Sequence, residues 1–246
     1  MRAAVVLLIA FLIGAAVFAE NRSVERKLLR ADPQGLPADA ALFGFALRRG
    51  APLFNAHCAA CHGASAAGDS ATGTPDLTDG DWLYGTGQVA EIEKVIDYGI
   101  RSRNARAWNL AVMPAYARPR PSPQDKGIKA LSPDDIDDLV EFLMRAQGRQ
   151  ADAESAARGA ALFDGHAGCF DCHSADAKGD SAIGAPNLTD GITLYGDGSR
   201  GALFMSIAYG RQGACPDWIK QLSPAAVREL ALYVYSISHP GAQHAD

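Results

Sequence analysis

Apolar residues recur with a helical period over much of the chain. The clearest case begins at Ser132. Ser132 and Asp135 form a capping box, Pro133 takes the first helical position, and the apolar face continues until Gly148 ends the helix. A second Ser-Pro pair, Ser223–Pro224, opens a similar segment near the C-terminus. Further amphipathic or short helical segments cover residues 38–56, 89–98, 153–163 and 201–209. The pattern therefore predicts an all-α chain with long loops.

The predicted elements occur in two copies. Residues 68–87 read GDSATGTPDLTDGDWLYGTG and residues 179–198 read GDSAIGAPNLTDGITLYGDG, with 14 of 20 positions identical at an offset of 111 residues. A polar linker lies between the copies. We therefore expect a first domain over residues 38–148 and a second over residues 152–240, preceded by an N-terminal segment over residues 1–30.

The repeat also carries a chemical motif. The same offset of 111 residues relates Cys58, Cys61 and His62 to the second set, which is Cys169, Cys172 and His173. A Cys-x-x-Cys-His run is the attachment signature of c-type haem. The two thiols form thioether bonds to the porphyrin, and the histidine becomes the proximal iron ligand. We therefore expect two covalently bound haems c, with His62 and His173 on the irons.

Other uses of paired cysteines explain less of the pattern. Four cysteines could bind zinc, each pair could be a redox-active dithiol, or the pairs could form structural disulfides. Zinc accounts for neither the adjoining histidines nor the duplicated loop. A dithiol enzyme would not normally carry two copies with histidine directly following.

Composition limits the classes of partner. The 246 residues are 48% apolar, enough to bury a core, and the net charge is −5. No basic cluster is interleaved with aromatic residues. Nucleic acid is therefore not an expected partner.

The N-terminal segment indicates export. Residues 3–19 are 17 residues without a charge, which suits a membrane anchor or a signal peptide with Val17 and Ala19 before the cleavage point. Basic residues follow the span and only Arg2 precedes it, which by the positive-inside rule favours a cytoplasmic flank. Haem attachment outside the bacterial cytoplasmic membrane overrides that rule. We expect a single-pass protein of the cytoplasmic membrane with its haem domains in the periplasm.

The sequence resembles a known family. The segments APNLTDGITLYG, TPDLTDGDWLYG, AYGRQG and SPAAVRELALYVYSIS are similar to the membrane-anchored dihaem subunit, subunit III, of cbb₃-type cytochrome c oxidases. The resemblance implies two tandem class I cytochrome c domains after an N-terminal transmembrane helix. It also implies a respiratory role, in which electrons pass from a redox donor protein such as a cytochrome towards haem-copper oxidase subunits.

The resemblance also implies roles for loop residues. In cytochromes c a proline carbonyl holds the second ring nitrogen of the proximal histidine, which assigns Pro75 to His62 and Pro186 to His173. Tyr84, Trp82 and Tyr195 would pack against the haems or reach a propionate, or serve only in the core.

The sixth iron ligand differs between the copies. After the repeated Tyr-Gly, the first copy inserts nine residues and then has Met113–Pro114, whereas the second has Cys215–Pro216 where the family has Met-Pro. A residue before proline is held extended, so both loops can present a side chain to iron. We expect Met113 to ligate the first haem and Cys215, the odd fifth cysteine, to ligate the second. If Cys215 is only a buried thiol, the alternatives are Met205, His239 or His166 as ligand, or no sixth protein ligand at all.

These observations favour an electron-transfer subunit of a respiratory complex. The alternative is a periplasmic sulfur-oxidising enzyme, resembling thiosulfate dehydrogenase, that uses a cysteine-ligated haem. A sensor with a displaceable axial thiolate is a third, weaker hypothesis. Turnover of thiosulfate would separate the enzyme from the electron relay.

Overall fold

The computed structural model describes residues 2–119 and 130–241, in which helices are joined by long irregular loops. Only isolated β-bridges occur among these residues, and none extends into a sheet. The helices are α1 (Arg2–Arg30), η1 (Pro33–Ala38), α2 (Ala40–His57), α3 (Ala59–His62), α4 (Val89–Tyr98), α5 (Pro133–Ala146), α6 (Ala153–Asp164), α7 (Phe170–His173), α8 (Arg200–Tyr209) and α9 (Pro224–Ser238). The prediction of an all-α chain with long loops is confirmed.

The helices begin where the sequence supplies caps. The Ser132 hydroxyl accepts a hydrogen bond from the Asp135 N–H, and Asp135 accepts one from the Ser132 N–H, so α5 starts with the predicted capping box. Ser223 caps α9 through the Ala226 N–H, with Pro224 at the first helical position. These side chains satisfy backbone donors that the first turn of a helix leaves without partners.

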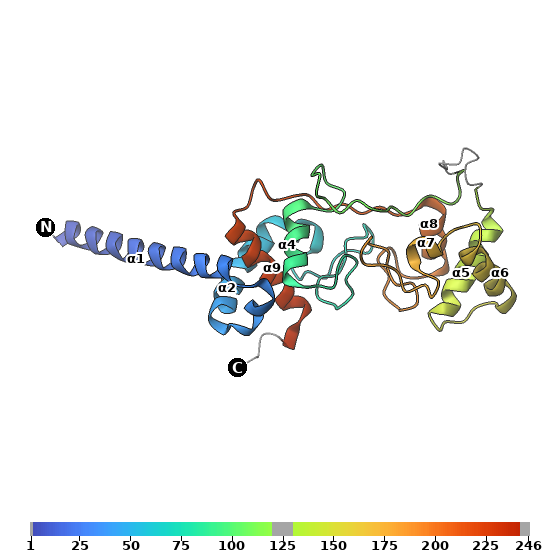
Figure 1. The fold of residues 1–246 in the computed structure, drawn as a ribbon, viewed down its shortest axis with the longest axis horizontal. Helices are drawn as coiled ribbons and strands as arrows, with labels where there is room; N and C mark the ends of the chain where they lie inside the picture. The colour runs from blue at the N-terminus through green and yellow to red at the C-terminus, as the bar shows by residue number, and fades with distance from the viewer. Residues whose placement is uncertain (1, 120–129, 242–246) are drawn as a thin grey trace.

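Helix α1 projects from the rest of the molecule (Figure 1). An 18-residue window within Val5–Arg30 has a mean hydropathy of 1.9, so by length and composition this helix could cross a membrane. The large apolar side chains from Val5 to Phe18 are exposed, whereas Leu28 near the end of the helix is fully buried. The N-terminal part of α1 therefore has no partner within the described chain, and its C-terminal end belongs to the folded body.

A first packed unit forms around α2, α4 and α9. Phe54 of α2, Ile92 of α4 and Leu230 of α9 lie in one buried cluster, which Leu28 of α1 also joins. The short helix α3, with the first Cys-x-x-Cys-His motif, follows α2 directly. We call this assembly of α2, α3, α4 and α9 the proximal unit, because it carries the anchor helix.

A second packed unit forms around α5, α6 and α8. Leu139 of α5, Phe163 of α6 and Ile207 of α8 are buried in a separate cluster. The short helix α7 carries the second Cys-x-x-Cys-His motif. We call α5, α6, α7 and α8 the distal unit, since it lies at the far end of the molecule from α1 (Figure 1).

The two repeats exchange their closing helices. Helix α5 ends the first repeat but packs on α6 and α8 of the second, and α9 ends the second repeat but packs on α2 and α4 of the first. The ranges 38–148 and 152–240 thus describe the repeat along the chain, whereas each packed unit draws on both ranges. Each closing helix thus completes the packed unit of the other copy, and not the expected domain in whose range it lies. The segments that lead to α5 and to α9 run side by side between the units (Figure 1).

Ion pairs connect the anchor helix to the proximal unit. Arg228 of α9 pairs with Glu93 of α4 and donates to the Leu28 carbonyl at 3.0 Å. Arg49 of α2 contacts Glu229 of α9 at 2.6 Å and Glu25 of α1 at 3.0 Å. Because Arg228 and Glu229 are both buried, these contacts join α1, α2, α4 and α9 into one body.

Candidate haem centres

Each Cys-x-x-Cys-His motif forms a single helical turn at the end of a longer helix or loop. Cys58 links α2 to α3, and Cys169 precedes α7. The backbone of each histidine donates to the carbonyl of its first cysteine, at 3.0 Å for His62 and 2.9 Å for His173. This turn places both cysteines and the histidine of each motif on one short element, as covalent haem attachment requires.

A proline carbonyl holds each histidine. The Nδ1 atom of His62 lies 3.0 Å from the Pro75 carbonyl oxygen, and Nδ1 of His173 lies 3.1 Å from that of Pro186. Burial lowers the pKa of both imidazoles, and the proline contacts oppose that shift. A neutral ring that donates from Nδ1 keeps Nε2 free to bind a metal. The structure thus brings together the histidine and proline pairs expected from the sequence.

Glycines allow these proline loops to close. Gly68 has φ +67° and a Cβ there would lie 2.4 Å from the Thr74 carbonyl oxygen. In the second copy Gly179 has φ +79°, and its Cβ would lie 2.3 Å from the Ala185 oxygen. Both the left-handed backbone and the close approach require glycine, which explains why the repeat begins with Gly-Asp twice.

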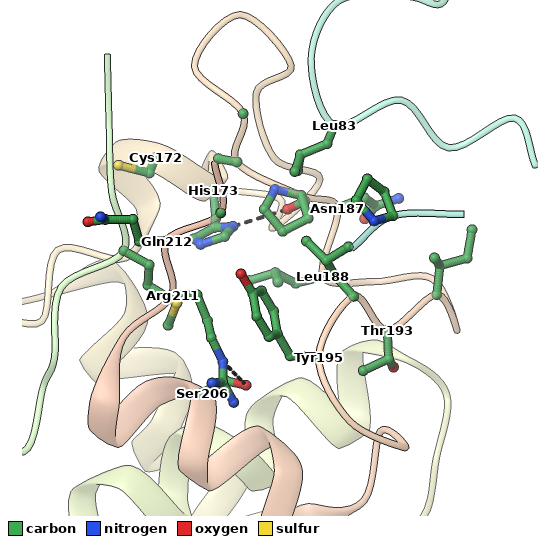
Figure 2. A pocket seen from close by; sticks show the side chains of 18 of the residues that line it. Leu83, Cys172, His173, Asn187, Leu188, Thr193, Tyr195, Ser206, Arg211 and Gln212 are labelled. Carbon is green, nitrogen blue, oxygen red and sulfur yellow. Dashed lines mark hydrogen bonds between the residues drawn. The ribbon is translucent and has the colours of Figure 1, made fainter. Parts of the chain in front are cut away.

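A cavity of about 450 Å³ lies at the second motif, between the distal unit and the repeated loop of the first copy, which contributes Pro75 and Leu83 to its lining. Figure 2 shows the His173 ring, Tyr195 and Arg211 directed into the same space. Cys169, Cys172 and Met113 also line this cavity. Two thiols, an imidazole that is held at its other nitrogen and a thioether are the donors that a covalently attached haem uses. The residues present therefore fit a haem c.

Met113 lies with the second motif and not with the first. The loop after α4 crosses to the distal unit, where Met113 pairs with Arg211 through two backbone hydrogen bonds of 3.1 Å. The loop after α8 crosses in the opposite direction, and Cys215 pairs with Ile100. The expected assignment of Met113 to the first haem and Cys215 to the second is therefore wrong. It assumed that each loop stays with its own repeat.

Cys215 lies close to the first motif. Its thiol is near enough to Cys58 and Cys61 to interact with them electrostatically. Burial, with a contribution from the neighbouring thiols, raises the pKa of Cys58 to about 12, and burial followed by Cys61 raises that of Cys215 to about 11. A redox-active dithiol needs a lowered thiol pKa, so the dithiol hypothesis finds no support here.

The alternative ligands lie elsewhere. Met205 on α8 is 49% exposed, and His166 is also exposed. His239 stacks on Tyr235 with ring centroids 4.1 Å apart. None of these three side chains lines the cavity at His173.

The two repeated loops face each other across the junction of the units. Tyr195 packs on Gly73, where a Cβ would lie 2.0 Å from its ring, and Tyr84 packs on Gly184 in the same way at 2.2 Å. The Gly85 N–H donates to the Ser181 carbonyl at 3.1 Å. Each tyrosine thus packs on a glycine of the other repeated loop. Trp82, the third aromatic residue named from the sequence, packs against the core of the proximal unit.

Three residues at this junction had no role predicted from the sequence. Arg211 lies over the Tyr195 ring at 4.4 Å, and Arg101 lies over the Tyr84 ring at 5.9 Å. Trp108 donates from its ring nitrogen to the Ala182 carbonyl at 2.9 Å. The sequence contains one signal for this set, which is an arginine close after each repeated Tyr-Gly. Arg211 follows directly in the second copy, and Arg101 follows one residue later in the first.

A shared zinc site is not assembled. The two Cys-x-x-Cys pairs belong to different units, and no disulfide joins any of the five cysteines, all of which lie in the described part of the chain. Among residues 2–119 and 130–241 no group of three or more His, Cys, Asp or Glu side chains could hold a metal ion. Neither the zinc nor the disulfide hypothesis is supported.

Two haem-attachment motifs, each on a helical unit with a proline-held histidine, define a tandem c-type cytochrome. Comparisons with known proteins agree with this class. Residues 47–147 match the cytochrome c family, and residues 154–234 match the family described as cytochrome c oxidase, cbb3-type, subunit III.

Relatives are similar over most of their length. The chain is 39% identical to the cbb3-type cytochrome c oxidase subunit CcoP of Rhodobacter capsulatus over 231 residues, which cover 90% of this chain and 73% of that protein. It is 34% identical to CcoP of Cereibacter sphaeroides, over 89% of this chain and 71% of that protein. The FixP subunit of Sinorhizobium medicae is 33% identical, over 81% and 63%. The chain belongs to the CcoP family of cbb3-type cytochrome c oxidase subunits.

Proposed function

We propose that this protein is the dihaem subunit of a cbb3-type oxidase and passes electrons from a redox donor protein towards the haem-copper subunits. The observation that carries the proposal is the duplicated Cys-x-x-Cys-His motif with its proline-held histidine, in a chain of the CcoP family. Haem iron, when bound, supplies one-electron chemistry. The chain carries two covalently bound haems c.

The residues of the chain fix the geometry of each centre. Cys58 and Cys61 attach the first haem, Cys169 and Cys172 attach the second, and His62 and His173 bind the irons. Pro75 and Pro186 orient the two imidazoles, which limits reorganisation when the charge on iron changes. Met113 serves the second haem, because it lines the cavity into which His173 points. A haem held by both an imidazole and a thioether would have a raised reduction potential.

The anchor places these centres at a membrane. Helix α1 crosses the cytoplasmic membrane, and its C-terminal end is held by Arg228 and Arg49 in the proximal unit. Haem attachment to Cys-x-x-Cys-His takes place outside the cytoplasm, so both units lie in the periplasm. The proximal unit is then nearest to a membrane-embedded partner, and the distal unit is open to a soluble donor.

The relatives support the electron-transfer subunit and not the sulfur-oxidising alternative. The test is to purify the tagged full-length chain from membranes and count haem by pyridine haemochrome after acid-acetone extraction. We expect two haems per chain, retention with membranes in high salt and co-purification of haem-copper subunits. Haem that is extracted by acid-acetone, or turnover of thiosulfate without oxidase subunits, would contradict the proposal.

A further inference from the structure

The two crossing loops make equivalent backbone contacts. After Met113 in the distal unit, Tyr116 N–H donates to the Ile207 carbonyl at 3.1 Å and Ala117 N–H to the Ala208 carbonyl at 3.0 Å. After Cys215 in the proximal unit, the Trp218 N–H donates to Ile96 at 3.0 Å and the Ile219 N–H to Asp97 at 3.2 Å. Ile96 and Asp97 are the repeat equivalents of Ile207 and Ala208. Cys215 therefore holds the same register in the proximal unit that Met113 holds in the distal unit.

The residues that precede these contacts agree as well. Met113 pairs with Arg211, and Cys215 pairs with Ile100, which is the repeat equivalent of Arg211. Gly210 and Gly99 pack on the carbonyl oxygens of Met113 and Cys215, and at each a Cβ would lie 2.4 Å away. The backbones at Met113 and Cys215 are thus held by repeat-equivalent partners on both sides.

The nine-residue insertion in the first copy does not disturb this register. The Trp108 N–H donates to the Gly99 carbonyl at 3.1 Å, and the Arg101 N–H donates to the Trp108 carbonyl at 2.9 Å. These bonds close the added residues into a side loop between Ile100 and Met113. The insertion is absorbed there, so the equivalence of Met113 and Cys215 holds despite the difference in length.

The side chain of Cys215 lies beside the first haem motif, in the proximal unit. Its thiol lies near Cys58 and Cys61 of the first motif and donates a hydrogen bond to the Pro216 carbonyl at 3.6 Å. A thiol is a weak hydrogen-bond donor. The position equivalent to the thioether of the distal unit is therefore occupied by a thiol with only a weak local contact.

We propose that the Cys215 sulfur, as thiolate, is the second protein ligand of the iron in the haem held by Cys58, Cys61 and His62. This inference rests on the proposed function, because it needs a haem at the first motif. On binding iron the thiol loses its proton to solvent, and the sulfur–hydrogen bond is replaced by a sulfur–iron bond. The anionic ligand stabilises ferric iron, so the proximal haem has a lower potential than the distal haem with its Met113 thioether.

The test is electron paramagnetic resonance and redox titration of the full-length protein, with near-infrared magnetic circular dichroism to identify the ligands. The wild-type protein should contain one low-spin haem with a thiolate-to-iron charge-transfer band and a lower potential, and one His/Met haem. Cys215→Ala should remove the thiolate species and leave the His/Met species unchanged. Cys215→Met should raise the lower potential towards the higher one. Met205→Ala, an exposed methionine, is the matched control and should change neither signal.

The haem count separates this inference from the proposed function. A wild-type count below two per chain defeats the proposed function and this inference with it. Two haems per chain without a thiolate band in the wild-type protein overturn the inference alone, whether or not the variants fold. Two haems per chain with both spectra and potentials unchanged in Cys215→Ala do the same.

Discussion

The backbones of Ile100 and Cys215 form a reciprocal pair of hydrogen bonds, each 2.9 Å long, although the two residues belong to different repeats. Met113 and Arg211 form the equivalent pair in the other direction. Each haem motif is thus completed by a loop from the other repeat. In two independent domains in series, each motif would instead be completed by the loop of its own repeat.

Met113→Ala should change the haem of the second motif. Loss of the thioether should remove the His/Met signature of the haem attached at Cys169 and Cys172, and lower its potential. The proximal haem should be unchanged. Electron paramagnetic resonance during a redox titration, which reports the ligands and the potential of each haem, would check this. A change confined to the haem at Cys58 and Cys61 would contradict the crossing.

The cores offer a matched pair of leucines. Leu230 on α9 is fully buried in the proximal unit, and Leu139 on α5 is 2% exposed in the distal unit. Each Leu→Ala change should cost about 3 kcal/mol. Leu230→Ala should first destabilise the unit of the first haem, and Leu139→Ala that of the second.

Thermal unfolding followed at the absorption and ligand signals of each haem is the measurement. If each closing helix served the haem motif of its own repeat, the two variants would give the reverse result.

The tyrosine contacts should be sensitive to a single methyl group. Gly73 has φ +73°, and a Cβ there would lie 2.0 Å from the Tyr195 ring. Gly73→Ala should therefore displace Tyr195 and destabilise the protein by about 2 kcal/mol. Gly80, which has no atom within 4 Å of an added Cβ, is the control.

Denaturant unfolding would compare the two variants. Gly80→Ala should be neutral or slightly stabilising. Equal stability of Gly73→Ala and Gly80→Ala would show that the loops do not meet at this junction.

Arg228→Met should loosen the anchor from the proximal unit. The change leaves Glu93 without its buried partner and removes a donor to the Leu28 carbonyl, so it should cost about 3 kcal/mol. Lys178→Met removes a pair with Asp176 in which both side chains are more than half exposed, and it should cost less than about 1 kcal/mol.

Limited proteolysis between α1 and α2 provides a second readout for these two variants. Arg228→Met should speed cleavage there, because the end of α1 is no longer held. Unchanged stability and cleavage in Arg228→Met would contradict the role of this ion pair.

Local features were predictable from the sequence. The capping box at Ser132, the helix cap at Ser223 and the haem motifs at Cys58 and Cys169 involve residues close together in the chain. Backbone sterics and short-range hydrogen bonds decide such features, so residue types and spacing are enough to find them. Alignment of the two copies at the repeated Tyr-Gly, with a nine-residue insertion in the first copy, likewise identified Cys215 as the counterpart of Met113.

Tertiary structure alone decided which haem motif each loop and closing helix joins. Because the repeats are so similar, α9 could satisfy the same apolar surface in its own copy or in the other, and local preferences are equal for both. The choice depends on contacts between distant residues, such as Leu230 with the α2 core and Cys215 with Ile100. Such contacts leave no periodic mark on the sequence, because they are set by the path of the connecting chain and by the packing of both units together.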